Sequence, residues 1–280
     1  MDLLVDYLIT NDDGIDAAGL QSLYRAVCLA VGDANRVAVV APDSVRSCCS
    51  HGVSTAEAMR VEEVGKQMWK VSGTPADCVR VAIKGLRIAP RWVLSGVNEG
   101  GNLGVDIHYS GTVAGAREAT LLGYRAIALS QYLRRDRPRD WDLSAQRAYN
   151  AITELQSKEL APSQFWNVNL PVVDHRDPSL PLQFAQAETG MLAFDFEDVQ
   201  PEYDPLDPSQ TTRLHTESHH TDGYKAGSHQ ASSHQAGNSV RWMKYRSNYQ
   251  DRPRTAPSDV ATCFAGSVTA TRLSILLPNG

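Results

Sequence analysis

The chain has 280 residues, a net charge of −5 and an ordinary composition, with 42% apolar and 21% charged residues. This length suits one large domain or two small ones, and the acidic balance gives no reason to expect nucleic acid as a structural partner. No apolar stretch approaches the roughly 20 residues that span a membrane. The start, MDLLVDYLIT, lacks the basic region of a signal peptide. Five cysteines without a C-x-x-C pair favour a reduced, cytoplasmic protein without a disulfide framework or structural zinc.

Short apolar runs alternate with helical patterns over the first 170 residues. Asp16 is predicted to cap the first helix and Gly32 to end it, while Thr74 and Pro75 mark the start of a second helix. The predicted elements are, in chain order, strand 3–10, helix 16–32, strand 36–42, a hairpin or ribbon within 53–73, helix 75–86, strand 91–96, helix 112–122, strand 125–130, helix 143–156 and strand 165–171.

This alternation predicts an α/β fold with a mainly parallel sheet and helices on both faces. In such sheets ligands bind beyond the carboxyl ends of the strands, where the strand order reverses. We treat residues 1–280 as one domain, with a catalytic core at 1–180 and an extension at 181–257. Residues 258–280 have strand-like composition and are expected to return to the body.

A histidine- and serine-rich stretch lies within the extension, at about 213–239. Histidine-rich tracts can bind metal. The spacing of these histidines is irregular, and Ser, Gly, Gln and Ala separate them. We therefore expect a flexible loop.

The loop after the first predicted strand carries two adjacent acids, Asp12 and Asp13, followed by Gly14. Two like charges about 4 Å apart repel by about 4 kcal/mol at an effective dielectric constant of 20. A divalent cation with a preference for oxygen ligands, such as magnesium, manganese or calcium, would offset that repulsion. A solvated turn explains the same residues, so this loop alone leaves both interpretations open.

The loop after the second long strand, APDSVRSCCSHG, offers Arg46 for a phosphate and Ser47 or Ser50 as a hydroxyl ligand. An ordinary polar loop is the alternative. No motif accompanies Cys48 and Cys49, and we expect both to be small buried side chains.

The third loop, SGVNEGGNLGVDIHYSGT, is rich in glycine and leads into a helix. Ser110, Gly111 and Thr112 lie where that helix begins, and the free N–H groups of a helix start favour a phosphate. The loop matches neither a Walker loop nor a dinucleotide-binding fingerprint. Together, the three loops suit metal-assisted phosphoryl hydrolysis.

Several motifs in one order resemble the SurE family of stationary-phase survival nucleotidases. They are NDDGIDAAGL, VVAPDSVRS, GTPADCV, SGVNEGGNLGVDIHYSGTVAGAREA and NVNLP, with a fainter match at SDVATCFAGSVTATRL. The resemblance implies a Rossmann-like three-layer α/β sandwich whose C-terminal extension takes part in forming homodimers or homotetramers. It also implies a Mg²⁺- or Mn²⁺-dependent 5′-nucleotidase, with possible 3′ activity, acting on nucleoside monophosphates.

The resemblance also implies roles for individual residues. The metal ligands would be Asp12, Asp13, Ser47 and Asn98. The phosphate would lie against Asn102, Ser110, Gly111 and Thr112, and the residues implied to be catalytic are Asp12, Asp13 and Asn102. Ala18 replaces a usual proline, and Cys48 replaces a usual glycine beside Ser47.

Two other functions stay open at this point. One is a nucleotide- or phosphate-binding protein with little turnover, its site altered by Cys48. The other is a broader phosphatase that also shortens polyphosphate, which the open glycine-rich loop would allow. The haloacid-dehalogenase type of phosphatase is set aside because its motif needs D-x-D, whereas Asp12 and Asp13 are adjacent.

Overall fold

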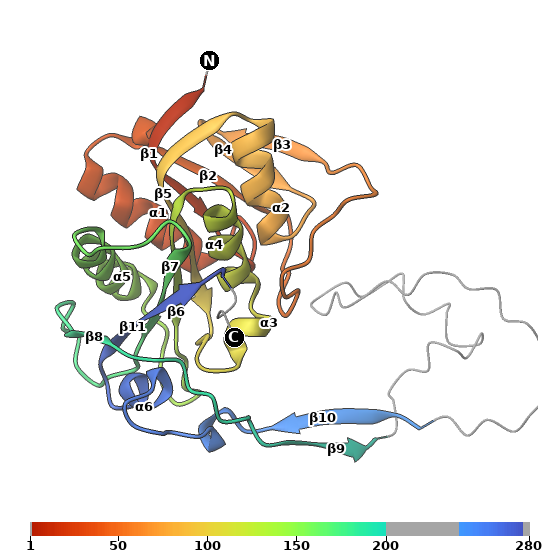
Figure 1. The fold of residues 1–280 in the computed structure, drawn as a ribbon, viewed down its shortest axis with the longest axis vertical. Helices are drawn as coiled ribbons and strands as arrows, with labels where there is room; N and C mark the ends of the chain where they lie inside the picture. The colour runs from red at the N-terminus through yellow and green to blue at the C-terminus, as the bar shows by residue number, and fades with distance from the viewer. Residues whose placement is uncertain (1, 200–240, 277–280) are drawn as a thin grey trace, which may run out of the picture. The chain divides into compact units, whose positions relative to one another are not determined.

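The computed structural model describes residues 2–199 and 241–276. Nine strands form the main sheet and two more form a separate pair (Figure 1). The strands are β1 (Leu3–Thr10), β2 (Val37–Pro42), β3 (Val61–Gly65), β4 (Met68–Val71), β5 (Ile88–Glu99), β6 (Arg125–Gln131), β7 (Gln164–Leu170), β8 (Leu182–Phe184), β9 (Phe194–Asp198), β10 (Met243–Ser247) and β11 (Val268–Ser274). The helices are α1 (Ala18–Val31), α2 (Pro75–Arg80), α3 (Asp106–Tyr109), α4 (Gly111–Leu121), α5 (Trp141–Gln156) and α6 (Asp259–Phe264).

The main sheet has the order β3-β4-β2-β1-β5-β6-β7-β11-β8. Strands β4, β2, β1, β5, β6 and β7 run parallel, while β3 and β11 pair antiparallel with β4 and β7. The prediction of a mainly parallel α/β sheet is confirmed. The chain leaves β1 on one side towards β2 and later returns on its other side as β5, so the strand order reverses at β1.

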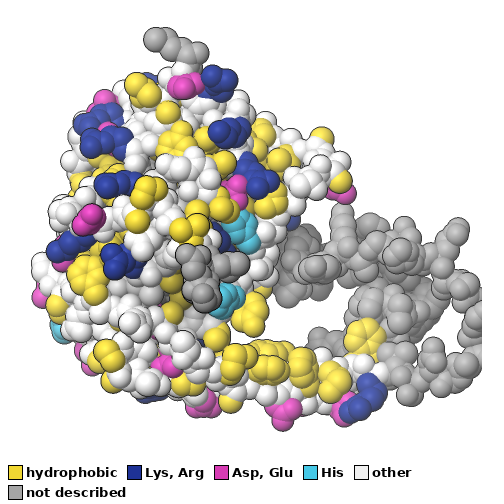
Figure 2. All heavy atoms as spheres, viewed as in Figure 1, with side chains coloured by type: hydrophobic (Ala, Val, Ile, Leu, Met, Phe, Trp, Pro, Cys, Tyr) yellow, Lys and Arg dark blue, Asp and Glu magenta, His cyan; other side chains and the backbone are white. Residues whose placement is uncertain are grey.

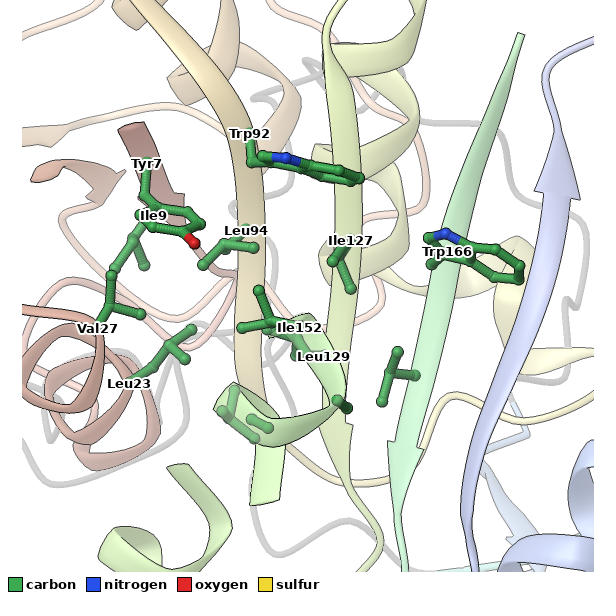
Figure 3. Close-up of a cluster of buried hydrophobic side chains, with 14 of the residues drawn as sticks. Tyr7, Ile9, Leu23, Val27, Trp92, Leu94, Ile127, Leu129, Ile152 and Trp166 are labelled. Carbon is green, nitrogen blue, oxygen red and sulfur yellow. The ribbon is translucent and has the colours of Figure 1, made fainter. Parts of the chain in front are cut away.

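Helices cover both faces of the sheet, and alternate residues of β1 supply the two cores. Ile9 packs in a cluster with Leu23 of α1 and Ile152 of α5 (Figure 3). Leu8 points to the other face and joins Val79 of α2 and Val113 of α4. Because side chains alternate along a strand, a strand buried on both faces is apolar at successive positions. The two clusters lie on opposite faces of the sheet, so the unit that contains this sheet has three layers.

The connection from β1 to α1 differs from the predicted one. Gly14 has φ +98°, and the side-chain amide of Asn11 donates to its carbonyl oxygen over 2.8 Å, which closes a turn. Helix α1 follows Ala17, which occupies the N-cap position without a side-chain hydrogen bond, so the prediction that Asp16 caps this helix is wrong. The predicted end is confirmed, because Gly32 ends α1 with φ +73°.

The predicted helix 75–86 is confirmed in its bounds. It begins with a capping box between Thr74 and Asp77, and after Arg80 it continues as a π-helical turn at Val81–Gly85. One other predicted element needs correction. Strand-like composition was predicted for 258–280, yet the described part begins with α6, capped by Ser258, before β11 returns to the sheet.

The chain divides into two compact units, Met1–Met191 with Arg252–Gly280, and Leu192–Asp251. The second unit contains β9 and β10, which form an antiparallel pair. Phe194, Phe196 and Tyr245 lie within ring-contact distance on this pair and are exposed, and Figure 2 shows hydrophobic side chains in a row along it. The predicted loop at 213–239 lies outside the described residues. No helix among residues 2–199 and 241–276 is long and apolar enough to cross a membrane.

Candidate active site

The residues predicted to bind metal and phosphate gather where the strand order reverses. Thr10, the last residue of β1, pairs with Ser95 of β5, so the acids after β1 lie beside the end of β5. The loop after β2 reaches the same edge of the sheet, because the Arg46 N–H donates to the Asp12 carbonyl over 2.7 Å. The start of α4 reaches it too, because the Thr112 hydroxyl donates to the Asp12 carboxylate. Three chain segments far apart in sequence therefore meet at Asp12.

Asp12 is the most buried of the predicted ligands, with 5% of its surface exposed. Its carboxylate accepts a hydrogen bond from the Thr112 hydroxyl. Burial, and next the charge of Asp13, raise the pKa of Asp12 from 3.8 to about 7, against the opposing effect of the Thr112 hydrogen bond. The protein itself therefore provides too little positive charge near Asp12 to keep this carboxyl in its ordinary range.

Asp13 is hydrogen-bonded to the end of β5. Its carboxylate accepts the Glu99 N–H over 2.9 Å, and burial raises its pKa. The neighbouring Asn98 uses its side-chain N–H to bond the Gly100 carbonyl over 2.8 Å. The Asn98 amide oxygen is thereby left for another partner.

The loop that carries Ser47 places two cysteines differently from the prediction. Ser47 and Cys48 are exposed, and Cys49 is half-buried, so the expectation that both cysteines are buried is wrong. The Cys49 thiol lies against Gly111 and Asp12, because a Cβ built on Gly111 would be 2.8 Å from both the Cys49 Sγ and the Asp12 Cβ. Burial, and next the charge of Asp12, raise the pKa of Cys49 to about 11.

Helix α4 begins against the Asp12 carboxylate. Ser110 caps it by accepting the Val113 N–H over 3.0 Å, and Gly111 and Thr112 form its first turn. Only glycine fits at position 111 without displacing Asp12, given the 2.8 Å spacing described above. The structure therefore brings Ser110, Gly111 and Thr112 to the acids, with the positive end of a helix directed at them.

Asn102 is hydrogen-bonded to residues of β6 and β7. Its side-chain N–H donates to Ser130 Oγ over 2.8 Å, and its backbone N–H donates to the Asn169 side chain over 2.8 Å. Its carbonyl accepts from the side chains of Asn167 and Asn169. Asn102 is thus fixed by β6 and β7, and its assignment to the phosphate stays a prediction.

The donor set fits a hard divalent cation. Among the described residues no group of three His, Cys, Asp or Glu side chains could hold a metal, so any metal here would rely on neutral ligands beside the two acids. Asp12 and Asp13 supply carboxylate oxygens, Asn98 a free amide oxygen and Ser47 an exposed hydroxyl. Carboxylate, carbonyl and hydroxyl oxygens suit magnesium or manganese.

A buried ionic cluster behind the site was missed in the sequence. Glu118 of α4 is 1% exposed and accepts hydrogen bonds from Arg80 over 2.6 Å and from His51 over 2.8 Å. Burial opposes ionisation of Glu118, but the bonds to His51 and Arg80 prevail and lower its pKa. His51 follows Ser47 by four residues, so the cluster ties the Ser47 loop to α4. The sequence carried one sign of this cluster, because Glu118 is an acid among the mostly small residues of α4.

Comparisons with known proteins identify the family. The family model described as survival protein SurE matches residues 7–190. A protein of Synechocystis sp., named putative 5′-nucleotidase, is 35% identical over 97% of this chain and 100% of its own length. The 5′-nucleotidase SurE of Campylobacter jejuni is 40% identical over 59% of this chain and 66% of its own length. The crystal structure of the SurE protein from Aquifex aeolicus superposes with a TM-score of 0.72 and 25% identity, over 98% of this chain and 95% of that one. The chain belongs to the SurE family.

Proposed function

We propose that this chain is a divalent-metal-dependent 5′-nucleotidase that releases phosphate from nucleoside monophosphates in the cytoplasm. The observation that carries the proposal is the buried Asp12 carboxylate, packed against the first turn of α4 and beside Asp13. Family membership and the 5′-nucleotidase names of two relatives support the same activity. Activity on 3′-nucleotides is a possible extension of the same reaction.

Asp12, Asp13, Ser47 and Asn98 are the proposed ligands of the cation, which we take to be magnesium or manganese. A divalent cation bound there would polarise the phosphate and lower the pKa of a water molecule beside it. The raised pKa of the metal-free Asp12 supports this assignment, because a cation is the counter-charge that the two acids lack.

The start of α4 is the proposed phosphate cradle. The first N–H groups of an α-helix have no partner within the helix, and here they belong to the turn that begins with Gly111 and Thr112. The Ser110 hydroxyl keeps its hydrogen for a phosphate oxygen while its oxygen caps the helix. Asn102 is the further group proposed to contact the phosphate, and together these donors would stabilise charge that develops on the phosphoryl oxygens.

The attacking group in this proposal is water. One of the two aspartates accepts the proton that this water loses as its oxygen bonds to phosphorus and the ester oxygen leaves. Direct attack by an aspartate is the alternative, and a trapped aspartyl-phosphate would replace the water mechanism with that one.

A substrate panel with EDTA and metal add-back tests the activity. We expect phosphate release from nucleoside monophosphates that EDTA abolishes and magnesium or manganese restores. Asp12→Ala and Asp13→Ala should lose it, while Asp16→Ala, which removes an exposed acid from the same loop, should retain it. Tight nucleotide binding without phosphate release would favour the binding-protein alternative, and release from polyphosphate would favour the broader phosphatase.

We also infer that the chain forms a homodimer or homotetramer. The exposed aromatic face formed by Phe194, Phe196 and Tyr245 supports this, because contiguous exposed apolar side chains commonly mark protein interfaces. Light scattering coupled to size-exclusion chromatography should give a mass of two or four chains. Phe196→Ser should shift that mass downwards, and a monomeric wild-type protein would contradict the inference.

A further inference from the structure

A cavity of about 260 Å³ lies beside the candidate active site, at the carboxyl ends of β6 and β7. Gln131, the last residue of β6, and Pro171, which follows β7, form part of its wall. The start of α5 and the loop after β7 complete it. Polar side chains inside this wall are bonded to one another, since the Ser144 hydroxyl donates to the Gln131 side chain over 2.8 Å. This bond ties the start of α5 to the end of β6 on the cavity wall.

Arg147 of α5 carries a buried positive charge on this cavity. Only 5% of its surface is exposed, and it lines the cavity. Its Nε donates to the Asp177 carbonyl over 2.9 Å and its Nη2 to the His175 carbonyl over 3.0 Å. Within residues 2–199 and 241–276, its Nη1 makes no hydrogen bond and no carboxylate oxygen lies within 4.0 Å of the guanidinium. The Nη1 group can therefore donate to a ligand in the cavity.

The other arginines on the wall form ion pairs with carboxylates, and none of those carboxylates pairs with Arg147. Four more arginines line the cavity, against two carboxylates, Asp140 and Asp174. Those two carboxylates already form ion pairs with Arg176 and Arg137. The longer-range attraction of Asp177 and Asp140 is weaker than the effect of burial, so the pKa of Arg147 is lowered. The other two arginines, Arg134 and Arg139, form ion pairs with Asp136 and Glu99. Among the described residues of this wall, Arg147 is therefore the arginine without a carboxylate partner.

The cavity is one strand away from the proposed metal ligands. Gln131 on its wall pairs with Glu99 of β5, which directly follows Asn98. Neighbouring strands are about 4.8 Å apart. Arg139, also on the wall, forms an ion pair with the Glu99 carboxylate, while the Glu99 N–H bonds Asp13. Asp12 follows β1, and β5 lies between β1 and β6, so the end of β5 separates the cavity from the two acids.

We propose that this cavity is a second anion subsite, which binds a phosphate group through the Arg147 guanidinium. Its volume is slightly below the roughly 300–1,000 Å³ of pockets that hold whole drug-sized ligands. It therefore takes one phosphoryl group with its neighbouring atoms, and not an entire nucleotide. The phosphate comes either from free inorganic phosphate or from the second phosphoryl group of a nucleoside 3′,5′-bisphosphate. The latter source rests on the proposed nucleotidase function.

Calorimetric titration with inorganic phosphate in the presence of EDTA tests the subsite without turnover. We expect wild-type protein to bind phosphate, and Arg147→Gln to weaken the Kd by about tenfold or more, as for loss of a charged hydrogen bond. Arg137→Gln at the cavity wall should weaken it by roughly two- to fivefold, and this half-exposed position keeps the test valid if Arg147→Gln does not fold. The matched control is Arg60→Gln. It removes an exposed arginine that precedes β3 and pairs with Glu62, and it should bind phosphate as the wild-type protein does.

Kinetics with AMP and adenosine 3′,5′-bisphosphate distinguish the two sources of the phosphate, which are free inorganic phosphate and the substrate. If the substrate supplies it, the kcat/KM ratio of bisphosphate to AMP falls by about tenfold in Arg147→Gln and by less in Arg137→Gln. If free phosphate is the ligand, that ratio stays constant while phosphate binding weakens. The subsite proposal would be overturned if neither Arg147→Gln nor Arg137→Gln changed phosphate binding or the kcat/KM ratio. Lack of AMP turnover would overturn the nucleotidase proposal, and the calorimetric result would stand by itself.

Discussion

Replacing Asp12 by asparagine should stabilise the metal-free protein at high pH. The Asp12 carboxyl is nearly fully buried, and its pKa is raised from 3.8 to about 7 by burial and by Asp13. A folded-state pKa above the unfolded one means that the folded protein holds a proton that the unfolded chain has released. The stability that this proton gives the folded wild-type protein is fully present below pH 3.8 and is lost as the pH rises through 7.

The size of this effect follows from the two pKa values. A change from 3.8 to about 7 corresponds to about 4 kcal/mol of unfolding free energy, at about 1.4 kcal/mol for each pKa unit. Between pH 5 and pH 8 the wild-type protein should lose about 3 kcal/mol relative to Asp12→Asn. Asparagine keeps the shape of the side chain and an oxygen that can accept the Thr112 hydroxyl, so packing around it changes little.

Urea unfolding in EDTA at several pH values measures this difference. The control is Asp16→Asn, which removes an exposed acid from the same loop and should follow the wild-type curve. Magnesium at about 100 times its Kd should return about 2.7 kcal/mol to the wild-type protein at pH 8 and much less to Asp12→Asn. A difference between wild type and Asp12→Asn that is the same at pH 5 and pH 8 would refute the reasoning, because Asp12 would then ionise normally in the folded protein.

Two substitutions on α4 and its surroundings give further predictions. Gly111→Ala places a Cβ 2.8 Å from the Asp12 Cβ, so it should cost about 1–3 kcal/mol in urea unfolding and most of the phosphate release. Gly85→Ala, whose Cβ meets only the Val81 side chain at 3.9 Å, is the matched control, and equal activity of the two variants would contradict the prediction. Glu118→Gln replaces the buried charge that Arg80 and His51 bond and should lower the unfolding free energy by about 1–3 kcal/mol; an unchanged urea midpoint would argue against it.

The central elements of the fold could be predicted because their residues are buried on both faces of the sheet. The apolar run at residues 3–10 coincides with β1, and Leu8 and Ile9 fill the two opposite cores. Helix ends with a specific backbone requirement were also predictable, as at Gly32 with its positive φ and at Thr74 with its capping box. In these places the local signal and the tertiary packing agree.

Prediction from the sequence was wrong or incomplete where contacts with distant residues or a neighbouring turn decide the local structure. Asp16 is a good N-cap residue, but the Gly14 turn lets α1 begin after Ala17 instead. Ser258 caps the short α6 within a segment whose β-branched residues resemble a strand. The contacts of Asn102 depend on Asn167 and Asn169, about 65 residues away, which no local pattern reveals. Adjacent cysteines likewise give no sign that Cys49 would lie against Asp12.

The end of β1 explains how two adjacent acids can serve one site. On a continuous strand, Asp12 and Asp13 would point to opposite faces of the sheet. Here the strand stops at Thr10 and the Gly14 turn follows, so Asp12 meets Thr112 of α4 while Asp13 meets the backbone of Glu99 at the end of β5. The charge of Asp13 still raises the pKa of Asp12, so the two carboxylates act on each other across the same small volume. The reversal of strand order at β1 therefore brings together the two elements that fix each acid, and the repulsion that remains between the acids is what a bound cation would relieve.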